Sequence, residues 1–367
     1  MTRRRVVFAG RTRYRLPLDD GTARKWDALG RELDFVVVAR GTGSGDARFD
    51  LTPPIRPRML DGVVYHALLP LRVRRVVRSF GADAVMAETP QVAALARLAG
   101  VPVVAEVHGN WRLTTRLYGS RLRSLLGPVV DAISGFGIRR AEAVRALSPY
   151  TATLVEEVRG RPPDAIFATY TDLAAFTATP PARLPERPTA LFVGALEPYK
   201  NVDGLVAAWR DVARRVADAR LVIVGGGPQR ALVEELAAEL PASVEHVPRT
   251  DAPGISALLD RSTVLVIPSR YEGLGRVVIE AFARGRGVVG ASAGGILDLV
   301  RHDREGLLVE PEDRGGLADA LVRVLTDREL AERLGAAARE RYADWHTTPE
   351  EFARRIRLVV EAALDRA

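Results

Sequence analysis

The stretch Pro268-Ser269-Arg270-Tyr271-Glu272-Gly273-Leu274-Gly275-Arg276-Val277-Val278-Ile279-Glu280-Ala281 decides the fold of this chain of 367 residues. It follows the apolar run 264–267, which predicts a buried parallel strand, and it enters a predicted helix over 277–284. The free N–H groups at the start of such a helix, together with the helix dipole, form an anion site. Glu272 and Glu280 flank the glycine turn and add acceptors for pairs of hydroxyl groups. A phosphate cradle beside two such acids indicates a nucleotide sugar, although one loop of this kind is also compatible with a plain βα unit carrying surface glutamates.

This segment resembles the E-x7-E signature of retaining family-4 glycosyltransferases, whose pattern runs roughly P-S-x-x-E-G-F-G-x-x-x-x-E-A. The resemblance implies that Glu280 accepts hydrogen bonds from the ribose 2′- and 3′-hydroxyls, and that Glu272 binds hydroxyls of the sugar. It also implies that the amides of Gly273, Leu274 and Gly275 hold the sugar and the diphosphate. Leu274 stands where the family usually carries an aromatic residue. The matching residues are Pro268, Ser269, Glu272, Gly273, Gly275, Glu280 and Ala281.

Length and composition favour two domains and exclude several classes of site. A chain of 367 residues exceeds what one hydrophobic core usually serves. The sequence has no cysteine, which excludes disulfides, thiolate catalysis and cysteine-ligated metal centres. No apolar run approaches the roughly 20 residues of a membrane span, and nothing resembles a signal peptide. We therefore expect a cytoplasmic protein, with contact at the inner face of the membrane left open.

The charge is unevenly distributed along the chain. Residues 1–178 carry a net charge of +10, whereas residues 179–367 carry −3. Arginines concentrate at 72–78 and 112–123, where amphipathic helices could touch anionic lipid or a phosphorylated acceptor. A solvated, arginine-rich surface is the simpler interpretation, and no aromatic-rich basic motif points to nucleic acid. Lys25 and Lys200 are the only lysines among 53 basic residues, so each invites a specific explanation.

Apolar runs alternate with helical periodicity, which predicts an α/β fold with two doubly wound, Rossmann-like domains facing a cleft. Residues 1–178 form the predicted acceptor-side domain, and residues 179–347 the nucleotide-sugar domain. The resemblance implies the GT-B architecture, in which residues 348–367 form a helix that packs back on the first domain. The predicted strands are 6–9, 35–38, 84–86, 103–107 and 143–146, followed by 190–193, 221–224, 244–247, 264–267 and 288–291.

A second motif, Leu191-Phe192-Val193-Gly194-Ala195-Leu196-Glu197-Pro198-Tyr199-Lys200-Asn201, reads as a strand, a glycine turn and a helix start. It resembles the family's G-x-L-x-x-x-K landmark, whose lysine neutralises the donor diphosphate, and Lys200 occupies that position. The family often adds an arginine at the position of Ala195 or Tyr199. Here both arginines are absent, so we expect Arg276 or an arginine of the first domain to supply the missing charge.

Two further turns are predicted to border the nucleotide pocket. The run 221–224 leads into Gly225, Gly226 and Gly227, but Arg230 replaces the third glycine of a dinucleotide fingerprint and Pro228 obstructs its helix start. A dehydrogenase is therefore disfavoured. The resemblance instead places Gly225 and Gly227 at the pocket wall, and Val247 and Arg249 near the base.

In the first half, the predicted strand 103–107 ends at His108. The family often carries a histidine there, near the transferred sugar and the acceptor, which makes His108 a catalytic candidate. Asp20 and Gly21 lie in a loop where the family usually has paired glycines, and we assign them to the acceptor side. The remaining histidines match no ligand spacing, so no metal is expected.

The resulting prediction is a metal-independent retaining glycosyltransferase with His108, Lys200 and Glu272 as catalytic residues. It would move a hexosyl unit from a UDP- or GDP-sugar to a hydroxyl acceptor and need no cofactor besides the donor. A nucleotide-sugar 2-epimerase of the same architecture and a non-catalytic nucleotide-sugar-binding protein remain alternatives.

Overall fold

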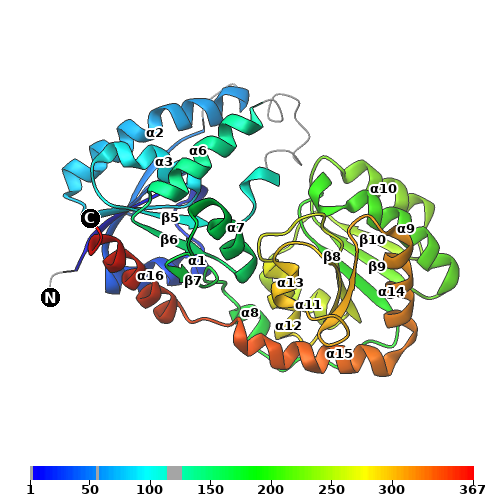
Figure 1. Ribbon diagram of the computed structural model, residues 1–367. Helices are drawn as coiled ribbons and strands as arrows, with labels where there is room; N and C mark the ends of the chain where they lie inside the picture. Colours follow the sequence, from blue (N-terminus) through cyan, green and yellow to red (C-terminus); the bar gives the residue numbers. More distant parts are fainter. Residues whose placement is uncertain (1–2, 55–57, 114–125) are drawn as a thin grey trace. The chain divides into compact units, whose positions relative to one another are not determined.

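The computed structural model describes residues 3–54, 58–113 and 126–367 (Figure 1). These residues form two compact units. The first contains residues 3–54, 58–113, 126–171 and 347–367, and the second contains residues 172–346. The domain limits at 178, inferred from the linker, and at 347, inferred from the predicted terminal helix, stay predictions. Among the described residues, no helix is long and apolar enough to cross a bilayer.

The first unit is built on a parallel sheet of seven strands in the order β3-β2-β1-β4-β5-β6-β7. All five predicted strands are present, with β1 longer than expected, and β3 and β7 are additional. The order reverses between β1 and β4, which is the doubly wound pattern. The strands are β1 (Arg5–Arg15), β2 (Asp34–Thr42), β3 (Phe49–Thr52), β4 (Ala84–Ala87), β5 (Val103–Val107), β6 (Ala143–Ala146) and β7 (Ala165–Ile166).

Helices cover both faces of this sheet. The side chains of α2, α3, α6 and α7 share one core, whereas α1 and α16 share another on the opposite face. The terminal helix α16 contacts α1, β4, β5 and β6, which confirms that the C-terminal helix packs on the first unit. The helices are α1 (Asp20–Glu32), α2 (Arg58–Phe80), α3 (Pro90–Ala96), the short 3-10 turn η1 (Arg97–Ala99), α6 (Gly127–Arg140), α7 (Pro149–Arg159) and α16 (Pro349–Leu364).

The second unit repeats the arrangement with six parallel strands in the order β10-β9-β8-β11-β12-β13. The five predicted strands are present, and β13 joins them at the edge beside β12. Both sheets thus have the doubly wound topology expected from the sequence. The strands are β8 (Thr189–Val193), β9 (Arg220–Val224), β10 (Val244–Val247), β11 (Val264–Ile267), β12 (Gly287–Ala291) and β13 (Gly306–Val309).

Two cores flank the second sheet as well. Residues of α9, α10 and α14 pack on one face, and residues of α8, α11, α12 and α13 pack on the other. The fully buried Arg284 follows α12, and its guanidinium donates to the carbonyl oxygens of Phe176, Thr179 and Pro180. The helices are α8 (Ala174–Thr177), η2 (Pro198–Lys200), α9 (Val202–Arg215), α10 (Arg230–Glu239), α11 (Ala252–Asp260), α12 (Arg276–Ala283), α13 (Ile296–Leu299), α14 (Arg314–Thr326), α15 (Arg328–Arg341) and η3 (Tyr342–Asp344).

Candidate active site

The loop between β11 and α12 forms the anion site that the sequence predicted. Strand β11 is buried along its whole length, as a central parallel strand should be. Gly275 caps α12 with φ +82°, a left-handed conformation that favours glycine. Among the described residues, the N–H groups of Gly273, Leu274 and Gly275 find no acceptor, so they remain available beside the positive end of the helix.

Gly294 and Gly295 pack against the backbone of this loop. The N–H of Gly295 donates to the carbonyl oxygen of Glu272 over 2.9 Å. A Cβ on Gly294 would lie 2.3 Å from that same oxygen, and one on Gly295 would lie 2.2 Å from the carbonyl oxygen of Gly273. The backbone of Glu272 can therefore sit where it does because residues 294 and 295 lack side chains.

Lys200 and Glu272 meet although they lie 72 positions apart. The ammonium group of Lys200 donates to Oε2 of Glu272, with 12% of the lysine side chain and 16% of the glutamate side chain exposed. Lys200 ends the turn η2, and its Nζ lies 5.4 Å from the centre of the Tyr199 ring. A cation and an acid that can each bind a different part of a donor are thus brought to one place.

Arg270 fixes the two loops to each other, a role that the sequence analysis missed. Its guanidinium binds both carboxylate oxygens of Asp203 at 2.9 Å and donates to the carbonyl oxygen of Pro198. Its own N–H donates to the carbonyl oxygen of Tyr199. Arg270 is therefore a positioning residue for Lys200. Arg270 lies inside the 268–281 motif, and this position was the indication of its role in the sequence.

Glu280 lies one turn inside α12 and is 6% exposed. Burial raises the pKa of its carboxyl group above the usual value of about 4.5, and Arg276 opposes this rise only in part. Nε of Arg276 lies 3.4 Å from Oε1 of Glu280, and 72% of the arginine side chain is exposed. Arg276, predicted to help neutralise the diphosphate, is thus paired with the acid predicted to bind ribose.

The other predicted nucleotide contacts line neighbouring strand ends. Gly194 follows β8, and a Cβ on it would lie 3.6 Å from Cε of Lys200. Gly225 packs closely on Gly194, because a Cβ added to Gly225 would lie 1.9 Å from the carbonyl oxygen of Gly194. Gly227 likewise lies close to the backbone of Leu196. Val247 is half-buried and its carbonyl oxygen accepts from Gly225.

Arg249, predicted to lie near the base, follows β10 and is exposed. Its assignment to the base stays a prediction.

His108 lies in the first unit, beyond the end of β5, beside a buried ion pair. Its Nε2 lies 3.6 Å from Oε2 of Glu106, and 37% of its side chain is exposed. Arg145, which is fully buried, binds the other oxygen of Glu106 and also donates to the carbonyl oxygen of Phe167. Burial by itself would raise the pKa of Glu106, but Arg145 and His108 outweigh it and lower the pKa to about 2. The sequence analysis did not identify this pair.

Replacing Glu106 with glutamine is expected to destabilise the fold by roughly 3–5 kcal/mol, because it leaves the buried guanidinium of Arg145 without its counter-charge. The pKa of Glu106 is depressed in the folded state, so its contribution is present above about pH 4.5 and is lost as the pH falls towards 2. Denaturant melts across this range measure the effect. Glu157→Gln is the control, since Glu157 forms an exposed pair with Arg112, and it should cost less than about 1 kcal/mol. Equal losses for the two variants would contradict the argument.

The segment around Asp20 and Gly21 differs from the loop that was expected. Helix α1 begins at Asp20, and the carboxylate of Asp19 caps it by accepting from the N–H of Thr22. Asp20 and Gly21 are therefore in the first helical turn, because the Asp19-Asp20-Gly21-Thr22 sequence supplies a cap one residue earlier. Their role towards an acceptor stays a prediction.

Lys25, the second lysine, lies on α1. Its Nζ is 4.6 Å from the centre of the Trp26 ring, and burial lowers its pKa. The described parts of the chain contain no group of three His, Asp or Glu side chains that could hold a metal ion.

Comparison with known proteins accounts for most of the chain. Residues 179–341 match the family described as glycosyl transferases group 1, and residues 20–171 match the glycosyl transferase 4-like domain. A GDP-mannose-dependent alpha-(1-6)-phosphatidylinositol monomannoside mannosyltransferase of Mycobacterium tuberculosis is 39% identical over 171 residues, which is 43% of each chain. The chain thus spans less than half of this relative. Glycogen synthase of the same species is 30% identical over 281 residues, covering 74% of this chain and 67% of the relative.

Solved structures share the fold of this chain. Sucrose-phosphate synthase from Thermosynechococcus elongatus superposes with a TM-score of 0.77 and 20% identity, covering 96% of this chain and 97% of the other. HepE from Anabaena, solved in complex with UDP, superposes with a TM-score of 0.69 and 17% identity over 96% and 98% of the two chains. The chain belongs to the group 1 glycosyltransferases of the family-4 type, which have the GT-B fold.

Proposed function

We propose that this protein is a retaining hexosyltransferase that uses a UDP- or GDP-sugar and a hydroxyl acceptor, without a metal ion or a further cofactor. The observation that carries the proposal is the meeting of Lys200 and Glu272 beside the free amides that precede α12. A donor offers a diphosphate to the cation and the amides, and sugar hydroxyls to the acid. Membership of the family supports this use of the site, and the relatives named above act on nucleotide sugars or glucans by their names.

Lys200, Glu272 and Glu280 would each bind a different part of the donor. Lys200 is held by Glu272, so donor binding would replace this ion pair with two sets of contacts. Lys200 would move to the diphosphate, together with the N–H groups of Gly273 to Gly275. Glu272 would then accept hydrogen bonds from the sugar, and Glu280 from the ribose.

The chemical step would proceed on one face of the sugar. The bond between C1 and the diphosphate oxygen breaks, and a bond between C1 and the acceptor oxygen forms on the same face, so the configuration is kept. The acceptor's proton passes to the departing phosphate oxygen. Lys200 and the amides stabilise the charge that develops on the leaving group, which is where preorganised electrostatics contribute most.

The acceptor would be a glycan, a lipid-linked sugar or a small hydroxyl compound. His108, Asp20 and Gly21 are our candidates for its side of the reaction, and they all belong to the first unit. We also propose a cytoplasmic location with peripheral contact at the inner face of the membrane.

The test is a thermal-shift panel of UDP- and GDP-sugars with the full chain, followed by NMR of reactions containing the best donor. We expect stabilisation by one nucleotide class and a product whose new glycosidic bond keeps the donor's anomeric configuration. The reaction should survive chelation of divalent metals.

Four other outcomes would each overturn one part of the proposal. An inverted anomer would overturn the retaining mechanism, and loss of activity with a chelator would overturn metal independence. An isomerised donor without an acceptor would indicate an epimerase. Nucleotide binding with no slow hydrolysis of any donor would indicate a binding protein.

A further inference from the structure

Helix α6 differs from an ordinary amphipathic helix of a globular protein, because most of its buried residues are small and several of its exposed residues are large and apolar. Its buried positions are mostly small, among them Ser134, Gly135 and Gly137. Gly137 is required for this contact, because a Cβ there would lie 2.0 Å from the carbonyl oxygen of Pro90 in α3. Ile138 is buried in the core, but several other bulky residues face outwards, with Val129 55% exposed and Phe136 45% exposed. Packing of the fold does not require large apolar side chains at these outward positions.

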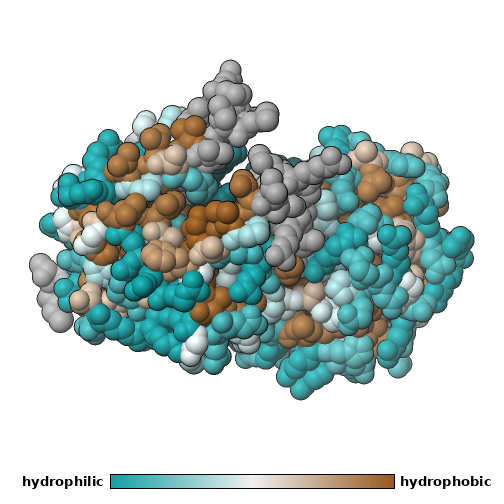
Figure 2. Space-filling model, turned by 45° about the horizontal axis from the view of Figure 1, so that its top comes forward, coloured by the Kyte–Doolittle hydropathy of each residue, from teal (hydrophilic) through white to brown (hydrophobic). Residues whose placement is uncertain are grey.

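Helix α2, which contacts α3 as α6 does, carries exposed apolar residues as well. Leu68 and Leu71 are 45% and 66% exposed, although buried positions of α2 such as Val73 face the core. Leu98 of η1, at 65%, continues the apolar surface, and η1 contacts α2. Helix α3 contacts both α2 and α6, so the three helices form one layer on the first unit. Figure 2 shows hydrophobic side chains gathered over this side of the unit.

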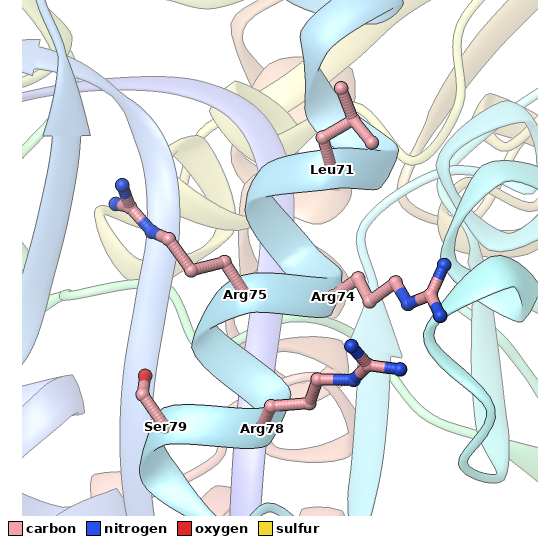
Figure 3. A pocket seen from close by; sticks show the side chains of 5 residues that line it. All are labelled: Leu71, Arg74, Arg75, Arg78 and Ser79. Carbon is pink, nitrogen blue, oxygen red and sulfur yellow. The ribbon is translucent and has the colours of Figure 1, made fainter.

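Arginines border these apolar residues. Leu71, Arg74, Arg75, Arg78 and Ser79 line an open depression on α2, in which Arg74 and Arg78 extend to one side and Arg75 to the other (Figure 3). Arg75 has a partner in Asp50 at 3.5 Å, whereas Arg74 and Arg78 have no ion-pair partner among the described residues. Arg139 and Arg140 add two exposed cations at the end of α6.

Acidic residues are nearly absent from this layer. The sequence has no Asp or Glu in residues 64–80, 90–99 or 132–140, and α2 and α6 each carry a single acidic residue, Asp61 and Asp131. Apolar side chains that enter the acyl boundary, bordered by cations that reach phosphate, suit the surface of an anionic bilayer. Arginine can also extend its charged end to the headgroups while its stem stays apolar.

We infer that the α2–η1–α6 surface, defined by Leu68, Leu71, Arg74, Arg78, Leu98, Val129, Ile133, Phe136 and Arg140, docks the protein on an anionic membrane. A bilayer fits this surface better than a folded protein partner, because its negative charge is spread over the whole plane and needs no matching carboxylate at each arginine. This surface belongs to the first unit and the glycine loops belong to the second, and docking does not depend on the proposed reaction.

The test is co-sedimentation of the full chain with vesicles of phosphatidylcholine alone or of phosphatidylcholine with phosphatidylglycerol. We expect binding to the anionic vesicles that weakens with added salt and little binding to the neutral ones. Arg74→Gln with Arg78→Gln should weaken binding by about fivefold for each arginine. Ile133→Gln with Phe136→Gln should weaken it by at least about tenfold, since both side chains lose their apolar contact.

Helix α16 of the same unit offers a matched control. Arg354 is exposed, and Leu358 one turn later is 48% exposed, so Arg354→Gln with Leu358→Gln removes a similar pair from another helix. This control should bind vesicles as the wild type does. Equal binding to both vesicle types, no binding at all, or an equal loss in the control would overturn the inference.

Thermal melts and nucleotide binding on the same variants show that each one is folded. They also separate this inference from the proposed reaction, because a chain that binds vesicles without transferring sugar would refute only the reaction. Sugar transfer to a soluble acceptor without vesicle binding would refute only the docking surface.

Discussion

Replacing Glu280 with glutamine is expected to weaken nucleotide binding by roughly 5–150-fold and, at neutral pH, to raise the melting temperature. Two ribose hydroxyls that donate to a carboxylate would lose a charged acceptor, which costs on the order of 1–3 kcal/mol. The fold, in contrast, gains from the change, because burial disfavours the charged form of Glu280 and the arginine beside it is largely exposed. Titration calorimetry with UDP and GDP measures the first effect, and thermal melts measure the second.

The pH dependence of the second effect has a defined sign. The pKa of Glu280 is raised in the folded state, so its neutral form is favoured there and the wild type loses stability as the pH rises through that pKa. The stability advantage of Glu280→Gln should therefore be larger at pH 7.5 than at about pH 4. Glu235→Gln on the exposed side of α10 is the control and should change neither quantity. Unaltered nucleotide affinity in Glu280→Gln would remove Glu280 from the site.

Replacing Lys200 with alanine is expected to lower kcat by about 10²–10³-fold, the loss typical of a preorganised group that stabilises a developing negative charge. Lys200→Arg should restore little of it, because a planar guanidinium cannot replace a compact ammonium group in a confined position next to Tyr199. Steady-state kinetics with a saturating donor measures the change. An arginine variant with wild-type turnover would show that positive charge alone suffices.

The ion pair between Lys200 and Glu272 predicts opposite effects on the binding of a nucleotide and of the full donor. Glu272→Gln releases Lys200 from its present partner, so binding of UDP or GDP without a sugar should be maintained or strengthened. Transfer from the full donor should fall, since the sugar loses its acceptor. Parallel losses of nucleotide affinity in Lys200→Ala and Glu272→Gln would mean that both side chains serve the diphosphate.

The sequence was sufficient to predict ten strands because most of them are apolar runs inside a parallel sheet, although β10 lies at the edge of its sheet. The sequence analysis missed β3, β13 and the two-residue β7, which all lie at the edges of their sheets. Their formation depends on a neighbouring strand more than on their own residues. The helical start at Asp20 was missed because Asp19 and Asp20 are both suitable caps, and the sequence does not choose between them.

The candidate site was predictable as a set of residues but not as a set of contacts. Glycine turns and acids at fixed spacing identified the β11–α12 loop and Lys200. The pairing of Lys200 with Glu272, the clamp formed by Arg270 and the buried Glu106–Arg145 pair join elements far apart in the chain. Such contacts depend on rotamers and strand order, which local patterns do not specify.

The placement of the two lysines gives this protein a built-in chemical reporter. An amine-selective acylating reagent has two side-chain targets, of which Lys25 lies against Trp26 and Lys200 is paired with Glu272 of the β11–α12 loop. Occupancy of the loops could thus be followed by mass spectrometry as protection of a single peptide, with the peptide containing Lys25 as an internal standard and without any engineered label.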